Sequence, residues 1–461
     1  MRIKSSGNEL KVNFIIIAVA NLGSKAIAFI LAPLYSYYLS VEQYGTMDLI
    51  TTTANLMLPF ICLDVYEATF RFASDHKYSE SEKLSTSLFL CLPAIIIYII
   101  ICLLYSFSPN ISKTILYTGA FVLLDAVNAV LAQHLRGSNR MVAYGMTGII
   151  NSVVLLISSV LFLVTLKRGL NGWCISFLLA KFANLVFAVF SIKLPRYLSH
   201  KSVNKSLMIE FLKYSVPLVP SATMWWIMNA SDRYMLALFI GTAATGIYAV
   251  GNKIPSLLSI LENIFYQAWQ TSAINAFEKK ERDRIYSVVF SNYFYVMTVG
   301  VAGVLLVAKL AITFLFAENY HSAWICMGPL TVGVMVHALA GNLGTLYTTF
   351  KKTKGALITT IAGAGCNILL NTFIIPVLGT LGAAITTLLG YTVTLFIRWF
   401  DVKKFASLTI NKKKILLYSI LILLQLLLYY IPGLLPYLFE LIILTFLFYS
   451  ERHLFIKMIK K

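Results

Sequence analysis

The sequence predicts an all-α integral membrane protein with about 14 transmembrane helices, built as two six-helix lobes followed by two additional helices. Three observations lead to this fold class. The 461 residues are 59% hydrophobic and only 12% charged, with a mean hydropathy of +0.78. Apolar stretches long enough to cross a bilayer as helices recur along the whole chain. Lys and Arg gather in every second gap between these stretches.

The apolar stretches define the predicted spans. Most reach the roughly 20 residues that a helix needs to cross the hydrocarbon core, whereas the last two have only about 17. The first follows a basic N-terminal segment, but it is too long for the apolar region of a signal peptide, so we interpret it as the first helix. The spans cover residues 12–38, 44–66, 84–106, 113–133, 141–166, 172–193, 211–239, 245–275, 285–316, 322–349, 355–376, 380–400, 415–431 and 434–450.

The positive charges predict the orientation of the chain. The two tails and the even-numbered gaps, with their flanking residues, hold 30 of the 38 Lys and Arg residues. The odd-numbered gaps hold only Lys113, Lys167 and Arg168. By the positive-inside rule, both termini and the basic gaps are cytoplasmic. The other five cations lie inside predicted spans, at Lys25, Lys181, Arg233, Lys253 and Lys309.

Composition excludes several classes of protein. The formal net charge of +19 is spread over short connections and forms no single basic face, so we expect no nucleic-acid binding. The six Cys residues lie in apolar runs without a CxxC spacing or a His/Cys cluster, and we expect neither a metal site nor disulfides. The gaps contain no phosphate-binding glycine loop and are too short for a nucleotide-binding domain, so we expect no cofactor and no ATP-driven transport by this chain alone.

Two parts of the chain are similar to each other. Gly45 in the run YLSVEQYGTMDL has a counterpart 201 residues later, at Gly246 in FIGTAATGIYAV. The segment Gly169–Gly172 has a counterpart at Gly379–Gly382, at an offset of 210, and a basic gap precedes both. A repeat unit of six spans has an even number of crossings, so both halves enter the membrane from the same side. We therefore predict a pseudo-two-fold axis along the membrane normal and a central cleft between the halves. The predicted domains are residues 1–200, 201–410 and 411–461.

Five segments carry a resemblance to a known family. They are LAPLYSYYLSVEQYG from residue 31, DVYEATFRF from 64, LRGSNR from 135, KYSVPLVPSATMWWIMNASDRYML from 213 and TGIYAVGNKI from 245. In order and spacing they resemble the polysaccharide-export flippases of the multidrug/oligosaccharidyl-lipid/polysaccharide exporter superfamily. The chain looks most like the O-antigen and capsule repeat-unit flippases, over about residues 10–400.

The resemblance implies a function and partners. Such proteins move an undecaprenyl-diphosphate-linked oligosaccharide from the cytoplasmic to the outer leaflet of the bacterial inner membrane, by alternating access of a cleft between two lobes. The implied partners are that lipid-linked oligosaccharide, membrane lipids, a coupling proton or cation, and a polysaccharide polymerase with its chain-length machinery. Related lipid flippases use their extra C-terminal helices to guide the lipid tail.

Charged and aromatic residues in the spans are the candidate substrate contacts, because ionisable groups in a bilayer are costly and tend to face a cavity or one another. We expect Lys25 and Lys253 to contact a diphosphate or an acidic sugar. Lys181 and Lys309 are weaker candidates. For all four, the alternative is a lysine that snorkels to the membrane surface or pairs structurally. Trp225 and Trp226 suit stacking on sugar rings, and core packing is their alternative.

Other polar residues are predicted to gate, couple or bend the transporter. Asp232 and Arg233 form either an outer gate or a permanent ion pair. Asp64, Glu67 and Arg71 form either a cytoplasmic gate or a solvated helix end. The candidate sites for ion coupling are Asp125 and Glu262, whereas we interpret His337 as a packed core histidine. Proline breaks the helical hydrogen-bond ladder, so the predicted hinge in span seven is at Pro217 and Pro220.

Two rival functions remain. A drug or cation antiporter of the same superfamily would have the same architecture, but basic residues outnumber acidic ones in the spans expected at the cleft, which favours an anionic cargo. A membrane polymerase or ligase would need a loop large enough to position acid and base residues. Gaps of about seven residues or fewer on the outer side leave no room for one, so we predict that the chain is not an enzyme.

Overall fold

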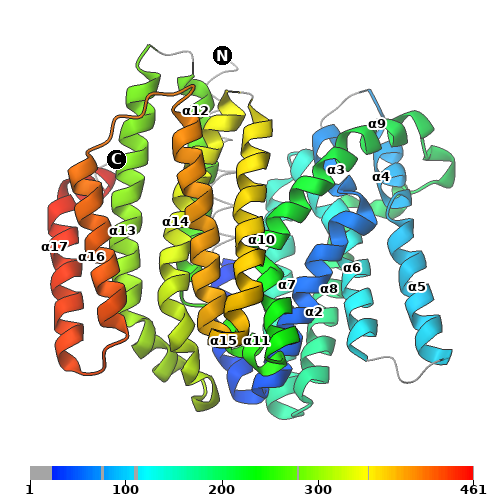
Figure 1. Cartoon of the computed structure of the whole chain (residues 1–461). Coiled ribbons are helices and arrows are strands. Elements are labelled where there is room, and N and C mark those ends of the chain that lie inside the picture. Colours follow the sequence, from blue (N-terminus) through cyan, green and yellow to red (C-terminus); the bar gives the residue numbers. More distant parts are fainter. Residues whose placement is uncertain (1–22, 74–76, 108–112, 278–279, 351, 460–461) are drawn as a thin grey trace. The chain divides into compact units, whose positions relative to one another are not determined.

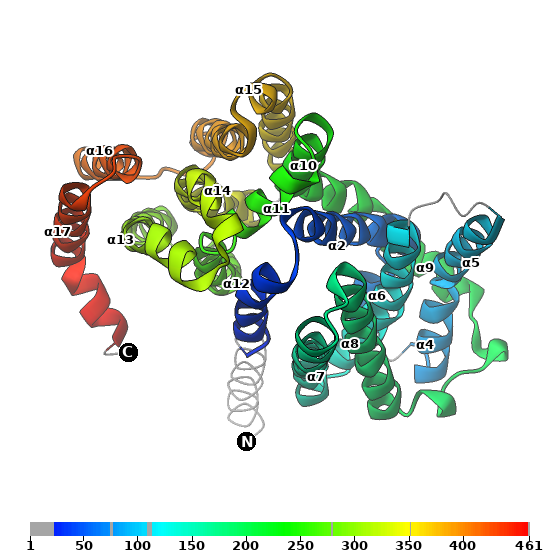
Figure 2. The ribbon, with the colours of Figure 1, turned by 90° about the horizontal axis from the view of Figure 1, so that it is seen from below.

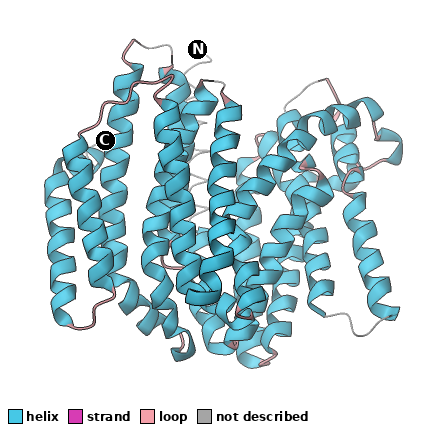
Figure 3. Cartoon of the chain, in the orientation of Figure 1, coloured by secondary structure: helices cyan, strands magenta, loops and turns pink. Residues whose placement is uncertain are grey.

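The computed structural model describes residues 23–73, 77–107, 113–277, 280–350 and 352–459. Within these ranges the secondary structure is helical, and no strand occurs (Figure 3). The chain divides into two compact units, Met1–Thr223 and Met224–Lys461. The predicted all-α membrane fold is therefore confirmed, whereas the predicted domain boundaries after residues 200 and 410 remain predictions.

Unit 1 begins with a helix at residues 23–38, and its labelled helices appear in Figure 1. They are α2 (Val41–Cys62), α3 (Val65–Ala73), α4 (Glu80–Phe89), α5 (Leu92–Phe107), α6 (Lys113–Gly137), α7 (Met141–Ser159), α8 (Gly169–Ile192) and α9 (Lys205–Ser215). A π-helical turn at Val160–Thr165 separates α7 from α8. Short 3-10 turns occur at Leu194–Arg196, His200–Ser202 and Val216–Leu218.

Unit 2 starts within α10 (Val219–Phe239) and contains the helices that follow it. They are α11 (Thr242–Gly251), α12 (Ser256–Ala276), α13 (Arg282–Leu315), α14 (Trp324–Thr349), α15 (Thr353–Val402), α16 (Lys412–Tyr429) and α17 (Leu434–Ile459), with a 3-10 turn at Glu318–Ala323 before α14.

Eight of the described helices are long and apolar enough to cross a membrane, or nine if the bent pair α2 and α3 forms one span. These helices fall on the predicted apolar stretches, because a helix is the form in which a chain satisfies its own backbone groups in lipid. The number of 14 spans is not confirmed.

The predicted second span is broken near its end. Helix α2 ends at Cys62, Leu63 and Asp64 have left-handed backbone angles (φ 49° and 52°), and α3 begins at Val65 with its axis bent by 64°. Helix α2 therefore covers the predicted span 44–66 up to Cys62, and the chain bends before the predicted end of that span. Neither Gly nor Pro stands at residues 63–64, so the sequence lacks the usual sign of a break there.

The repeated glycine segments adopt the same local geometry in both units. Gly169 and Gly379 have φ angles of 54° and 55°, which side chains rarely tolerate. Three residues later, a Cβ atom on Gly172 would lie 2.9 Å from the carbonyl oxygen of Phe162, and one on Gly382 would lie 2.8 Å from that of Ile374. Each hairpin thus turns at one glycine and packs closely at the next, as the predicted repeat requires.

The two C-terminal helices belong to the core of unit 2. Figure 2 shows α16 and α17 beside α13. The fully buried Gln425 on α16 donates a hydrogen bond to the carbonyl of Ala302 on α13 at 2.9 Å. The hydroxyl of Tyr429 donates to the carbonyl of Trp324 at 2.8 Å. Buried polar contacts of this kind hold α16 in one position against α13 and α14.

Candidate functional site

A cavity of about 250 Å³ lies inside unit 2. Helices α10, α11, α12, α14 and α15 form its walls. The residues lining it are Asp232, Tyr248, Asn252, Ser256, Ser259, Glu262, Asn263, Leu330, Val334, His337, Thr387 and Tyr391. Polar and titratable groups that meet in one cavity are the usual mark of a binding site, so we take this cavity as the candidate site.

Asp232 lies on one side of the cavity with its carboxylate fully engaged. The side chain is only 2% exposed. It accepts hydrogen bonds from the Tyr248 hydroxyl at 2.8 Å, the Thr387 hydroxyl at 2.5 Å and the Asn371 amide at 2.8 Å. Hydrogen-bond donors from α11 and α15 thus satisfy the carboxyl group of Asp232 in the interior.

Glu262 and His337 form an acid–imidazole pair in the same cavity. The Glu262 Oε1 and His337 Nδ1 atoms are 2.7 Å apart, and the two side chains are 13% and 20% exposed. The His337 ring also packs on Tyr391, with a centroid distance of 4.8 Å. His337 is thus packed against an aromatic ring, as the interpretation of a core histidine expects, and its ring also lines a polar cavity. Such a pair can share or pass on a proton.

The titratable residues of the cavity carry charge of the same sign as a diphosphate, so the cavity does not suit that anion. Among the described residues that line it, Asp232 and Glu262 are acidic and none is Lys or Arg. The predicted anion contacts therefore lie elsewhere. Lys253 is half-buried in the turn between α11 and α12, beside the lining residue Asn252, and Lys25 is exposed on the helix at residues 23–38. Their contact with a substrate stays a prediction.

Lys181 and Asp125, which the sequence assigned to separate roles, form one ion pair between α8 and α6. Their side chains are 20% and 17% exposed. The Lys181 ammonium also lies 5.1 Å from the Phe177 ring centroid, and the Asn128 amide donates to the Lys181 carbonyl at 3.0 Å. The ion pair favours the alternative of a structural lysine for Lys181, and its contact with substrate stays a prediction.

Of the remaining aromatic and cationic candidates, Lys309 and Trp226 lie against aromatic rings. The Lys309 ammonium lies over the rings of Trp324 and Tyr429, at 4.4 and 4.7 Å from their centroids. Trp226 packs on Tyr234 at 5.4 Å, and the side chain of Trp225 is outside the described part of the chain. Contact of these residues with substrate stays a prediction.

The proline hinge lies where the sequence predicts it, but it separates two helices. Pro217 is in the 3-10 turn at Val216–Leu218, between α9 and α10, and Pro220 is in the first turn of α10. The helix is interrupted at residues 216–218, inside the predicted span 211–239, which agrees with the proline break that the sequence predicts there. Its role as a hinge stays a prediction.

The predicted gates differ in how far they are buried. Asp64 is 2% exposed, Arg71 is exposed, and Glu67 accepts a weak hydrogen bond from the Gln133 amide at 3.5 Å. Arg233 is half-buried on α10, next to Asp232. Neutral donors satisfy Asp232, as described above. Both gates stay predictions.

Arg398 is a buried cation that the sequence counted among the cytoplasmic flanks. It is 4% exposed and donates to the Ala340 carbonyl at 2.7 Å and to the Thr359 and Thr360 hydroxyls at 3.0 and 2.9 Å. It therefore joins α14 to both halves of α15. Gly344 leaves room for the guanidinium, since a Cβ atom there would lie 2.7 Å from Arg398 Nη1. The sequence alone does not identify such a glycine as the neighbour of a buried arginine.

Comparison with known proteins identifies the family. The family model described as "Polysaccharide biosynthesis protein" matches residues 10–270, more than half of the chain. The chain belongs to this family. Among curated protein sequences, none matches it. The predicted resemblance to polysaccharide-export proteins is thereby confirmed.

Solved structures of low sequence identity share its fold. A lipid II flippase MurJ in an inward closed conformation has 16% identity and a TM-score of 0.72, covering 97% of this chain and 100% of that one. An inward-facing multidrug resistance MATE family transporter of the MOP superfamily has 14% identity and a TM-score of 0.67, covering 89% and 98%. A Vibrio cholerae MATE transporter has 13% identity and a TM-score of 0.57, covering 87% and 98%. The chain is thus a multi-pass membrane protein with the fold of exporters and flippases.

Proposed function

We propose that this protein flips a polyprenyl-diphosphate-linked oligosaccharide, such as an O-antigen or capsule repeat unit, from the cytoplasmic to the outer leaflet of the bacterial inner membrane. The observation that carries the proposal is membership of the polysaccharide biosynthesis family over residues 10–270. Its fold is also that of a protein named as a lipid II flippase. In this orientation both termini are cytoplasmic, because the basic gaps and tails lie on the inner side.

The physical task explains the proposed substrate contacts. A diphosphate and several sugars lose their water without replacement if they enter hydrocarbon unaided. Lys25 and Lys253 would supply positive charge along the path, one from each compact unit. Their flexible ammonium groups can follow a moving anion, while the polyprenyl tail remains in lipid.

The acidic cavity of unit 2 has a different proposed role, in coupling. Its volume of about 250 Å³ is below the roughly 300–1,000 Å³ of sites for drug-sized ligands. A proton or a small cation fits such a space and its two carboxylates. We therefore assign ion coupling to Glu262 with His337, and we no longer assign it to Asp125, whose charge is compensated by Lys181.

The proposed function is tested by reconstitution. The purified protein is placed in vesicles that carry a polyprenyl-diphosphate oligosaccharide with a fluorescent sugar, and a membrane-impermeant quencher reports the outer-leaflet fraction. We expect the protein to speed exchange between leaflets, and the Lys25→Ala/Lys253→Ala double variant to slow it. Exchange no faster than in protein-free vesicles would refute the proposal. In cells, a polymerase and its chain-length machinery would take up the flipped product.

A drug or cation antiporter is the second candidate. It is favoured by the acidic lining of the cavity and by the likeness in fold to multidrug resistance transporters. The same vesicles, loaded with a cationic dye, distinguish the two functions. Dye efflux driven by a proton or sodium gradient, without exchange of the lipid-linked oligosaccharide, would establish the antiporter.

A further inference from the structure

The break between α2 and α3 holds a buried acid, Asp64, which so far has only the predicted role of a gate residue. Asp64 is 2% exposed and has a left-handed backbone conformation, with φ 52°. Its Oδ1 atom is buried and has no hydrogen-bond partner among the described residues. Tyr66, two residues further on, provides a hydrogen bond to the same carboxyl group. The acid is therefore buried, and one of its two carboxyl oxygens has no hydrogen-bond donor among the described residues.

Further acceptors surround this carboxyl group. The last carbonyls of α2 point toward the break without intrahelical donors, at the negative end of the helix dipole. Glu67 lies one turn along α3, and the Gln133 amide on α6 donates to it at 3.5 Å. The Gln133 Oε1 atom is itself buried without a partner among the described residues. The break thus gathers carboxylate and amide oxygens, and none of the described donors there, including the first N–H groups of α3, reaches Asp64 Oδ1.

The positive groups nearby are already engaged. Arg136 on α6 interacts with Glu67, and its guanidinium lies 4.5 Å from the Phe70 ring centroid. The other titratable groups at the break are Tyr66 and Cys62. Helix α9, which packs on α3, contributes Glu210, whose partner is Lys77 at 2.6 Å, and Lys213 near its end. No ion pair of Asp64 with Lys, Arg or His occurs among the described residues.

An ionised carboxylate in such surroundings is costly, because its charge is neither paired nor hydrated. We propose that Asp64 is a proton-binding site at this helix break. A proton from water adds to Oδ1 and converts the carboxylate into a neutral acid, and no other bond forms or breaks. The acid then has an O–H that can donate to one of the unpartnered oxygens around it. Release returns the proton to water and restores the charge.

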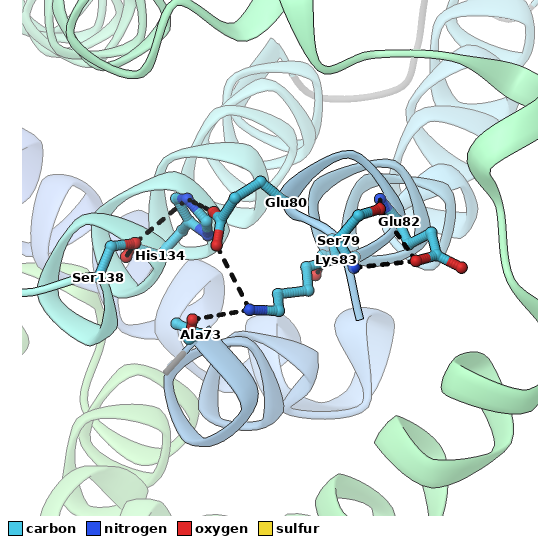
Figure 4. Close-up of polar contacts among 8 residues, drawn as sticks. Ala73, Ser79, Glu80, Glu82, Lys83, His134 and Ser138 are labelled. Atoms are coloured by element: carbon cyan, nitrogen blue, oxygen red, sulfur yellow. Dashed lines mark hydrogen bonds and ion pairs between the residues drawn. The ribbon is translucent and has the colours of Figure 1, made fainter. Parts of the chain in front are cut away.

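The contacts of α3 indicate which part of the helix a proton on Asp64 would affect. The far end of α3 is fixed, because the buried Lys83 donates to the Ala73 carbonyl at 2.9 Å and also pairs with Glu80 at 3.3 Å (Figure 4). A Cβ on Gly137 of α6 would lie only 2.7 Å from the Phe70 carbonyl, so the helices are in close contact there. A change in the charge of Asp64 would therefore act on the near end of α3, where the helix begins.

This inference goes beyond the proposed function and does not depend on it. It places a proton site in unit 1, whereas the acid–imidazole pair of Glu262 and His337 is in unit 2. A flippase or an antiporter could use it equally, and the binding of a proton can be measured without any transported substrate.

Dicyclohexylcarbodiimide tests the proposal, since it reacts with protonated carboxylic acids in apolar surroundings. The full-length protein in vesicles is treated between about pH 6 and about pH 9, and the labelled peptides are identified by mass spectrometry. We expect label on Asp64 at low pH, falling about tenfold per pH unit once the acid is mostly ionised. The peptide with Asp125, whose carboxylate is paired with Lys181, is the internal control and should remain unlabelled.

A second measurement keeps the test independent of access by the reagent. Infrared difference spectra between low and high pH should show the C=O band of a protonated acid, and Asp64→Asn should remove it while Glu67→Gln retains it. Absence of both the label and the band at low pH would overturn the proposal. Protection of Asp64 by sodium at constant pH would also overturn it, because the oxygens would then bind an alkali cation.

Discussion

The ion pair between Asp125 and Lys181 decides whether these two charges serve structure or transport. We consider three variants, Asp125→Asn, Lys181→Met and the two together. Each single change leaves one charge inside unit 1 without its partner, between α6 and α8. The double change removes both charges and leaves side chains of similar size.

The expected magnitude follows from the burial of the pair. Breaking a fully buried pair costs about 3–5 kcal/mol, whereas an exposed pair contributes at most about 1 kcal/mol. The side chains of Lys181 and Asp125 are 20% and 17% exposed, so the pair lies between these limits. We expect each single variant to lose about 2 kcal/mol of unfolding free energy, and the double variant to lose about 1–2 kcal/mol less than the sum of the two.

Denaturation of the purified variants in one detergent gives the coupling energy, and oligosaccharide exchange in vesicles gives the function. If the pair is structural, the double variant is more stable than the sum of the two single losses predicts, and it transports at close to the wild-type rate. Additive losses of stability would refute the ion pair as a coupled unit. A stable double variant without transport would instead restore Lys181 as a substrate contact or Asp125 as a coupling site.

Three further predictions concern the site and the fold. Glu262→Gln should remove most of the pH dependence of transport while the protein still inserts normally, as measured by exchange rates across a pH series; an unchanged pH profile would exclude this carboxyl group from coupling. Lys25→Ala and Lys253→Ala should each lower oligosaccharide exchange several-fold at wild-type protein levels, and wild-type exchange in both would remove them from the path. Gly382→Ala should destabilise the protein by about 1–3 kcal/mol, because the new Cβ atom would lie 2.8 Å from a carbonyl oxygen. Gly303→Ala is the control and should not destabilise it, because nothing lies within 4 Å of its Cβ position. Equal midpoints of denaturation for the two variants would contradict this prediction.

Much of the fold follows from short-range features of the sequence. Lipid requires each spanning segment to be apolar and helical, so the spans are visible as runs in the chain. The paired segments Gly169–Gly172 and Gly379–Gly382 predicted a repeat, and the first glycine of each has a positive φ, a conformation that glycine tolerates more easily than other residues. The break at Asp64 could not be predicted in this way, since it has neither Gly nor Pro.

The candidate site was only partly predictable. Glu262 was identified as an intramembrane acid, but its partner His337 is 75 residues away, and this spacing carries no local signal. The same holds for Asp125 and Lys181, which are 56 residues apart, and for Asp232, whose donors come from α11 and α15. In each case a single charge in a span could be found, but its partner could not.

The sequence by itself determined that this protein crosses the membrane many times, and it predicted which side the loops face. The free energy of transfer from water into lipid decides which segments cross the membrane, and the Lys and Arg residues beside them decide the orientation. Only the tertiary structure decided which charges meet, because that depends on the rotation of each helix about its axis and on contacts between helices that are distant in the chain. It turned two predicted sites into one ion pair, placed His337 in a cavity, and left the Oδ1 atom of Asp64 without a donor among the described residues.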